Sequence, residues 1–313
     1  MLDHKLYTFL KVIELGSFSK AAAELNLTQP AVSQQISQLE EELGVPLLIR
    51  KRGSLTLTPQ GEIACRYARN LLKTYSGIWS ELDDLNKEYR HIMVGITPIA
   101  QSSPLVDVLV RYSARKRDLK FSMYEQNPER ICNLIQTGVV SWGILDSVPM
   151  DRLSDSDLQV LTLETEQLEC VLCPGHPLAA GESVSIADLR KEAMLLPQPK
   201  YTSTALFSEA LQQAGSSLDD LRIILETDDV AALKRYAAEG IGITVLPRSC
   251  CEREVRSGEL VLRPIREIHV SSRVCMVYAE GNRDLDILHE IAAQFRIARG
   301  AGAVPDPEAS LKK

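Results

Sequence analysis

Residues 28–38, which read TQPAVSQQISQ, place amide and hydroxyl side chains where a surface helix usually has Lys and Glu. A Gln side chain can make two hydrogen bonds to the edge of adenine, and a Ser hydroxyl can bond to several bases. Lys and Glu on the same face would contact phosphate or water instead. These residue types therefore favour recognition of base edges in DNA over catalysis.

A helix must hold these side chains, and the same segment has the pattern for one. Thr28 is a good N-cap, and Pro30 falls in the first turn, where its missing N–H costs nothing. Gly44 is placed to end the helix. One apolar stripe would pack against the preceding helix: Val32, Ile36, Leu39 and Leu43. A surface helix that is merely rich in Gln and Ser is the alternative interpretation.

Two further helices are predicted before this one. Residues 3–15 carry apolar side chains at the spacing of one helical face, and Ser19 is the expected cap of a helix that continues to Leu25. Residues 26–28 then form the turn. This predicts a helix-turn-helix at about residues 18–38, in which the later helix presents its first residues to base edges.

Residues 47–58, LLIRKRGSLTLT, predict a hairpin with a basic tip after the three helices. A basic hairpin in this position is a wing, and its charges suit phosphates or a narrow minor groove. Residues 1–58 are therefore interpreted as a winged helix-turn-helix domain. The expected DNA contacts are Thr28, Gln29, Pro30, Ser33, Gln34, Arg50, Lys51 and Arg52.

A long helix is predicted over residues 59–90, because Thr58 and Pro59 are a cap followed by a first-turn proline. Its apolar residues recur at spacings of three and four and form a single seam, namely Ile63, Tyr67, Leu71, Tyr75, Ile78, Leu82, Leu85 and Tyr89. One seam along about thirty residues suits a contact between two helices of a dimer. Burial of the seam against the rest of the same chain is the alternative.

From residue 91 the pattern changes to alternating strands and helices, which is typical of an α/β body with mostly parallel sheets. Two separate strands are expected at residues 158–164 and 168–174. The body would divide into two lobes. Residues 299–313 have too little apolar content to fold and are expected to be a disordered tail.

The composition limits the classes of function that the chain can have. The 313 residues include 35 Lys and Arg against 42 Asp and Glu, so the formal net charge is −7. This excludes a nonspecific nucleic-acid coat but not a small DNA-reading domain on an acidic body. The N-terminus does not resemble a secretory signal, and no run of about 18 apolar residues occurs, so we expect a cytoplasmic protein without a membrane partner.

No constellation for catalysis, a metal or a cofactor can be assembled. The seven cysteines are scattered, as in a protein with reduced thiols. Cys170 and Cys173 would face opposite sides of a strand, so they are expected to be core residues. A thiolate at Cys250 or Cys251, at a helix start, remains an alternative that implies redox sensing. His176 is expected to be a structural turn residue, and the protein is not expected to be an enzyme.

Residues 9–61, FLKVIELGSFSKAAAELNLTQPAVSQQISQLEEELGVPLLIRKRGSLTLTPQG, resemble the LysR-type transcriptional regulators, with weaker similarity in CPGHPLA (173–179) and ETDDVAALKRYAAEGIGITVLP (226–247). The resemblance implies a winged helix-turn-helix, a linker helix that dimerises, and a two-lobed α/β effector domain like a periplasmic binding protein. Lobe I is placed at residues 91–162 and 269–298, and lobe II at 163–264. The crossing strands are placed near residues 160–165 and 264–268.

The resemblance also implies a small polar or anionic effector between the lobes, where helix starts offer free N–H groups. The expected effector-binding residues are Thr97, Pro98, Ile99, Gln101, Ser102, Ser103, Asp146, Tyr201, Thr202, Ser203, Thr227 and Asp228. Simple helix capping is the alternative role for Ser102, Thr202 and Asp228. Many family members have an Arg in the helix that begins near Thr204, but this chain does not, which disfavours a strongly anionic effector.

The implied partners are double-stranded operator DNA, the effector, a second copy in a homodimer that the family often pairs into a homotetramer, and RNA polymerase if the protein is an activator. A solute-binding protein for transport and an enzyme are the two alternative classes. A transport protein would have no use for the N-terminal DNA-binding module, and no catalytic constellation can be assembled for an enzyme.

Overall fold

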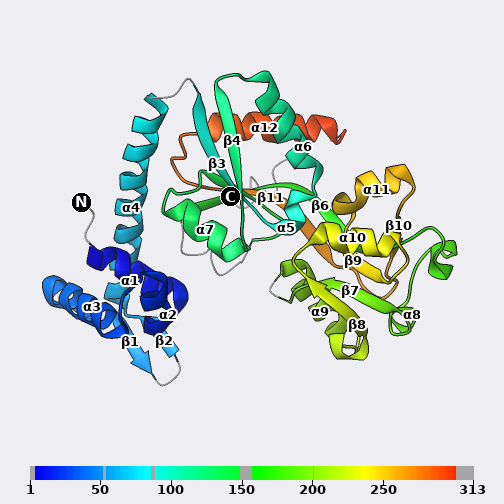
Figure 1. Ribbon diagram of the computed structural model, residues 1–313, viewed down its shortest axis with the longest axis horizontal. Helices are drawn as coiled ribbons and strands as arrows, with labels where there is room; N and C mark the ends of the chain where they lie inside the picture. Colours follow the sequence, from blue (N-terminus) through cyan, green and yellow to red (C-terminus); the bar gives the residue numbers. More distant parts are fainter. Residues whose placement is uncertain (1–3, 52–53, 86–88, 149–156, 200, 301–313) are drawn as a thin grey trace, which may run out of the picture. The chain divides into compact units, whose positions relative to one another are not determined.

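The computed structural model describes residues 4–51, 54–85, 89–148, 157–199 and 201–300 (Figure 1). The chain divides into two compact units, one of residues 1–88 with 136–139 and one of residues 89–135 with 140–313. Each unit is described by itself below. None of the described helices is both long and apolar enough to span a membrane.

The N-terminal unit begins with three helices and a hairpin, namely α1 (His4–Leu15), α2 (Phe18–Glu24), α3 (Gln29–Leu43), β1 (Leu48–Lys51) and β2 (Ser54–Leu57). Phe9, Val32 and Ile36 are fully buried in its core, so the predicted stripe of α3 packs on the helices before it. One detail of the prediction was wrong. The side chain that caps α2 is Ser17, whose Oγ accepts from the backbone N–H of Lys20, and Ser19 lies inside the helix.

Helix α4 (Pro59–Leu85) follows the hairpin. Thr58 caps it, since its Oγ1 accepts from the backbone N–H of Gly61 at 2.9 Å. Cys65 and Ala68 pack into the core of the winged domain. The predicted seam lies on another side of the helix, where Ile63, Tyr67, Leu71, Ile78 and Leu82 are each about half exposed.

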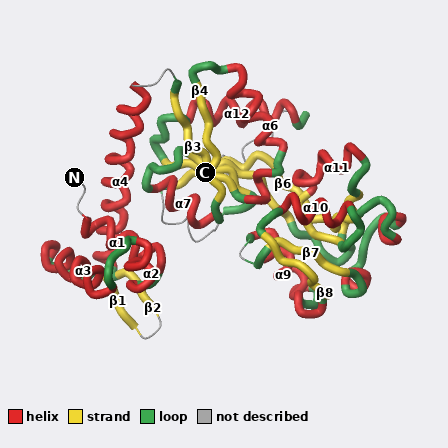
Figure 2. Tube along the Cα trace, in the orientation of Figure 1, coloured by secondary structure: helices red, strands yellow, loops and turns green. Residues whose placement is uncertain are grey.

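The C-terminal unit is built on one sheet of nine strands (Figure 2). The strands are β3 (Arg90–Ile96), β4 (Leu119–Glu125), β5 (Trp142–Leu145), β6 (Leu158–Leu172), β7 (Ala193–Pro197), β8 (Arg222–Thr227), β9 (Ile243–Pro247), β10 (Val261–Pro264) and β11 (Ser271–Ala279). The helices are α5 (Pro98–Gln101), α6 (Pro104–Arg115), α7 (Pro128–Gln136), α8 (Ile186–Leu189), α9 (Thr202–Gln213), α10 (Val230–Ala238), α11 (Glu252–Ser257) and α12 (Leu285–Ala298). Short 3-10 turns occur at η2 (Pro177–Ala180), η3 (Leu218–Asp220) and η4 (Arg248–Cys251).

The sheet is mixed, which corrects the expectation of mostly parallel strands. Its order is β4-β3-β5-β11-β6-β9-β7-β8, with β10 also paired to β6. β3 runs parallel to β4 and β5, and β7 runs parallel to β8 and β9. β6 and β11 run antiparallel to all their neighbours, because each passes between the two halves of the sheet.

The separate strands expected at 158–164 and 168–174 are also wrong, since residues 158–172 form the single strand β6. Its first part pairs with β11 and its last part with β9 and β10. We call lobe I the half with β3, β4, β5 and β11, and lobe II the half with β7 to β10. A register shift opposite Val274 and Cys275 interrupts the β6–β11 pairing near the middle.

Helices cover both faces of each half. In lobe I, α6 and α12 pack on one face of the sheet and α7 on the other. Gly95 and Gly143 are paired in β3 and β5, and a Cβ on either would lie within 2.7 Å of the Ile131 side chain. The two glycines therefore let α7 approach the strands closely. In lobe II, α9 packs on one face and α10 on the other.

Candidate functional site

The start of α3 has the predicted N-cap and exposes most of the side chains that were predicted to contact DNA. Thr28 is the N-cap, and its Oγ1 accepts from the backbone N–H of Ala31 at 3.3 Å. Thr28, Gln29, Pro30 and Gln34 are exposed, and Ser33 is half-buried. The hydrogen-bonding side chains thus occupy the solvent side of a helix whose other side is core.

The wing is fixed to α3 through one carboxylate. Glu40 Oε1 accepts from the backbone N–H groups of Leu47 at 2.7 Å and Leu48 at 3.2 Å. Arg50 and Lys51 lie at the end of β1, next to the turn of the hairpin. Arg52 lies outside the described residues. Glu40 was not singled out from the sequence, and an acidic side chain just before the end of a helix gives little signal for such a role.

In lobe I, two polar side chains meet at the carboxyl ends of parallel strands. Ile96, the last residue of β3, is in register with Glu125 in β4 and Ile144 in β5. Thr97 and Asp146 come directly after those ends and are 0% and 4% exposed. The Thr97 hydroxyl donates to Asp146 Oδ1 at 2.6 Å. Burial raises the pKa of Asp146 above the ordinary range of a carboxyl, and the bond from Thr97 offsets part of that increase.

In lobe II, the corresponding place is the start of α9. Tyr201 is the N-cap residue and makes no side-chain cap bond, so the first amides of α9 have no cap. The Ser203 side chain is 2% exposed, and its Oγ has no hydrogen-bond partner in the described residues. Thr202 is half-buried, and Thr204 donates to the carbonyl oxygen of Pro197 at 2.9 Å.

Several acidic groups act on Tyr201 electrostatically. Burial raises the pKa of Tyr201 to about 12, together with the charge of Asp228 and a hydrogen bond to its carboxylate. The negative charges of Glu125 and Asp146 act in the same direction. Glu125 was not among the predicted site residues, although its place at the end of a predicted strand is the same signal that pointed to Asp146.

Three helix assignments are corrected at this site. Asp229, and not Thr227 or Asp228, caps α10, since its Oδ1 accepts from the backbone N–H of Ala232 at 3.0 Å. Gln101 ends the short helix α5, and Ser102 is its C-cap. The next helix begins only after Ser103, whose Oγ accepts from the N–H of Leu105 at 3.3 Å and is thereby occupied.

The structure places Pro98 and Ile99 in the interior. Ile99 is 2% exposed and belongs to the cluster that includes Val230 and Leu246 of lobe II. Its carbonyl oxygen accepts from Cys250 Sγ at 3.3 Å. Ile99 thus holds the two lobes together and does not present its side chain to an open surface.

The cysteines fit a structural role. Cys250 and Cys251 are buried, which raises the pKa of both thiols, that of Cys251 to about 12. Burial likewise raises the pKa of Cys170 to about 12. A thiol that stays protonated is a poor nucleophile and metal ligand. Within the described part of the chain, no group of three or more His, Cys, Asp or Glu side chains could hold a metal ion.

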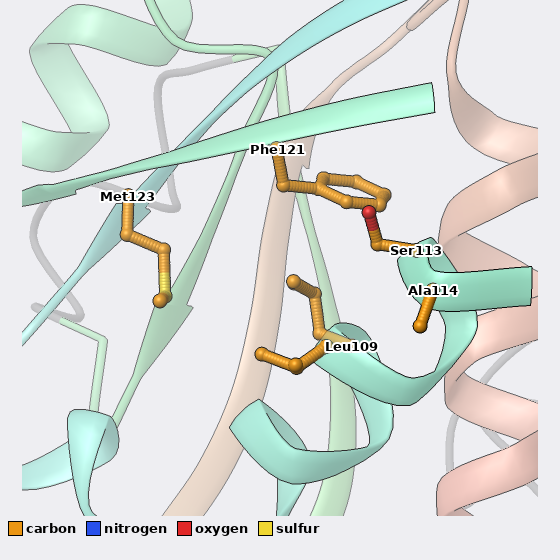
Figure 3. Close-up of a pocket in the computed structure, with 6 residues that line it drawn as sticks. Leu109, Ser113, Ala114, Phe121 and Met123 are labelled. Atoms are coloured by element: carbon orange, nitrogen blue, oxygen red, sulfur yellow. The ribbon is translucent and has the colours of Figure 1, made fainter. Parts of the chain in front are cut away.

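An apolar pocket of about 310 Å³ lies elsewhere, between α6 and β4 (Figure 3). Its lining residues are Leu109, Val110, Ser113, Ala114, Phe121 and Met123. With a single hydroxyl among six side chains, it offers little to a polar ligand. None of its residues is among those that were predicted to bind an effector.

Two family models together match almost the whole described chain. Residues 4–62 match the description "Bacterial regulatory helix-turn-helix protein, lysR family", and residues 86–296 match "LysR substrate binding domain". The chain is 29% identical over 293 residues to the HTH-type transcriptional regulator AlsR of Bacillus subtilis (strain 168), which covers 93% of this chain and 94% of AlsR.

Solved structures have the same fold. Full-length BenM is 24% identical to this chain, with a TM-score of 0.57. The match covers 97% of this chain and 99% of the BenM chain. CbnR, crystallised in complex with its target DNA, is 18% identical to this chain, with a TM-score of 0.54. The match covers 93% of this chain and 99% of the CbnR chain. The chain belongs to the LysR family of DNA-binding transcriptional regulators, with an N-terminal helix-turn-helix and a C-terminal effector-binding domain.

Proposed function

We propose that the exposed start of α3 reads the operator sequence and that the wing binds the DNA backbone. Gln29 and Gln34 supply amides, and Ser33 a hydroxyl, next to a helix start that the Thr28 cap holds in place. The basic residues Arg50, Lys51 and Arg52 suit phosphates. The crystal structure of CbnR with its target DNA supports the same use of the domain here.

The functional unit in this proposal is a homodimer joined through α4, and dimers pair into a homotetramer. The observation that supports the dimer is the seam on α4, where Ile63, Tyr67, Leu71 and Ile78 are about half exposed in the single chain. Apolar residues in one line along a helix are normally covered. A second α4 of the same sequence offers a matching line, and two recognition helices then meet two half-sites.

The third part of the proposal is that a small polar effector binds at the strand ends, beside the start of α9. The observation that carries it is the Ser203 hydroxyl, which is buried without a hydrogen-bond partner in the described residues, at an uncapped helix start. A buried hydroxyl without a partner costs free energy, and a ligand oxygen would remove that cost. Ligands of open α/β sheets bind outside the carboxyl ends of the strands.

The regulator acts in the cytoplasm, where its DNA is, and contacts RNA polymerase if it activates transcription. A mobility-shift assay on the DNA upstream of its own and neighbouring genes tests operator binding. We expect specific retardation that changes when an effector from a thermal-shift screen is added. Retardation equal to that of random DNA would overturn the first part of the proposal. Binding that no compound alters would overturn the third.

A further inference from the structure

The strand ends that meet around the proposed effector site are acidic. Glu125 ends β4, Asp146 follows β5, and Asp228 follows β8. Parallel pairing puts Glu125 and Asp146 on one edge of lobe I, beside Thr97. The residues at these ends, 97–99, 125–127, 146–148, 197–199 and 227–229, include four Asp and Glu. The Lys nearest to these ends in the sequence is Lys200, which lies outside the described residues.

Negative charges of both lobes act on one residue, Tyr201. The Tyr201 hydroxyl, in lobe II, forms a hydrogen bond with Asp228 of the same lobe. The charges of Glu125 and Asp146, both in lobe I, also act on this hydroxyl. Tyr201 is 6% exposed, so the region that these groups share is partly shielded from solvent.

The other two carboxylates that are less than 10% exposed among the described residues of this unit have cationic partners. Asp284 pairs with Arg90 at 2.5 Å, and Glu169 pairs with Arg248 at 3.0 Å. Asp146 is as deeply buried, yet no Lys, Arg or His among the described residues forms an ion pair with it. Its side-chain partner is the neutral hydroxyl of Thr97. A buried carboxyl without a cation is unfavourable when ionised, and a bound cation would remove that penalty.

We propose that the effector carries a cationic nitrogen group, an ammonium or guanidinium, which binds among Asp146, Glu125 and Asp228. This inference rests on the proposed effector site. An oxygen of the same molecule accepts from the Ser203 hydroxyl and the first amides of α9. The class that fits both ends is an amino acid with a cationic side chain, or a derivative of one. The purely anionic effector that the family resemblance allowed does not fit this charge.

The test uses the full chain and matched pairs of compounds in thermal-shift and calorimetric titrations. L-arginine is compared with L-citrulline, which has the same length but a neutral urea, and L-lysine with Nε-acetyl-L-lysine. Putrescine and agmatine supply the cation alone, and succinate and citrate are the anionic probes. We expect the cationic member of a pair to bind at least tenfold more tightly than its neutral partner.

Three variants assign the effect to the site. Asp146→Asn removes the charge but keeps an acceptor for Thr97. Glu125→Gln removes the charge at an exposed position that tolerates substitution. Both should weaken binding of the cationic compound at least tenfold. Glu209→Gln, on an exposed position of α9, is the matched control and should leave its affinity unchanged. Without ligand, the double variant Asp146→Asn Glu125→Gln should melt at a higher temperature than the wild type.

The outcomes separate this inference from the proposed function. If succinate or citrate binds and Ser203→Ala abolishes its effect, the effector site stands and the cationic class is wrong. If the neutral and cationic members bind equally, the cationic class is also wrong. A double variant that melts lower than the wild type would contradict the uncompensated charge without any ligand. If no compound of any class binds, the proposed effector site itself fails.

Discussion

The Sγ atom of Cys250 donates a hydrogen bond to the backbone carbonyl of Ile99 at 3.3 Å, and this bond joins lobe II to lobe I. The Ile99 side chain lies in the same place, inside an apolar cluster of lobe II. Thr97 of the proposed effector site is the N-cap residue of the short helix α5, which carries Ile99. A ligand that moves Thr97 therefore also acts on the contact between the lobes.

Two further contacts reach the same segment of lobe II. Both carboxylate oxygens of Glu166, on the crossing strand β6, accept from Ser249, one from its N–H at 2.6 Å and one from its hydroxyl at 2.7 Å. Arg299 bridges Glu164 of β6 and Glu252 of α11, each at 2.5 Å. The segment 248–252 is thus where the relative position of the lobes is fixed. Arg299 contributes to these contacts, although it was expected to belong to a disordered tail. Residues 301–313 of that expected tail lie outside the described residues.

Ile99→Ala should destabilise the effector domain by about 2–5 kcal/mol, because it leaves a cavity in a fully packed cluster. It should also weaken the effect of ligand on DNA binding, since the side chain connects the lobes. Urea unfolding measures the first effect and a mobility shift with ligand the second. Ile241→Ala is the control, because Ile241 is 50% exposed and its loss should cost about 0.5 kcal/mol or less. Equal effects of the two substitutions would contradict this role of Ile99.

The pH dependence of stability should reveal Glu166. Burial raises its pKa in the folded chain, and the bonds from Ser249 offset part of the increase. Its contribution to stability is fully present below the pKa of the unfolded chain and is lost as the pH rises through the folded pKa. Relative to Glu166→Gln, the wild type should therefore lose stability as the pH rises above the ordinary range of a carboxyl. Urea unfolding at several pH values measures the difference.

Asp188 provides a control of opposite sign for that experiment. Hydrogen bonds from Ser185 lower the pKa of Asp188. Its stabilising contribution is therefore present above the unfolded pKa and is lost as the pH falls. Relative to Asp188→Asn, the wild type should gain stability as the pH rises. The same sign for both variants would mean that Glu166 is not destabilised by its burial.

Operator reading should depend on Gln34. Gln34→Ala should cost about 1–3 kcal/mol of discrimination at one base pair, since an amide can make two hydrogen bonds to adenine. Gln38→Ala is the matched control, because Gln38 is exposed one turn further from the start of α3. Competition binding with single-base variants of the operator measures both. A loss in Gln34→Ala that is equal on operator and random DNA would exclude a base contact.

Much of this architecture is predictable because its signals are local. The Thr28 cap, the Gly44 C-cap and the strands 119–125, 193–197, 222–227 and 243–247 follow from residue types over a few positions. Caps are less certain where candidates are adjacent. Ser17 and Ser19 are two residues apart, as are Thr227 and Asp229, and only the backbone conformation decides which side chain caps.

The errors concern long-range features. Glu164 and Glu166 interrupt the apolar run of β6, so the strand looked like two, but these residues are where it passes from one lobe to the other. Strand direction was misjudged for the same reason, since a strand that crosses between lobes runs antiparallel to its neighbours. The acidic character of the proposed effector site was not predicted, because Glu125, Asp146 and Asp228 are far apart in the sequence.

The last prediction concerns Leu71, in the middle of the exposed seam of α4. Its side chain is 50% exposed in the single chain, and Ile63, Tyr67 and Ile78 lie in line with it on the same side of the helix. If two α4 helices pack along this line, Leu71→Asp places a charge in an apolar contact, where burial without a partner costs several kcal/mol. The dissociation constant of the dimer should then rise by at least a hundredfold, and operator affinity should fall because two half-sites are no longer bound together.

Ser76→Asp introduces the same charge on another side of α4 and should leave the dimer intact. Light scattering at micromolar concentration measures the mass of the wild type and of both variants. A monomeric wild type, or a Leu71→Asp protein with the mass of the wild type, would show that the seam serves another contact.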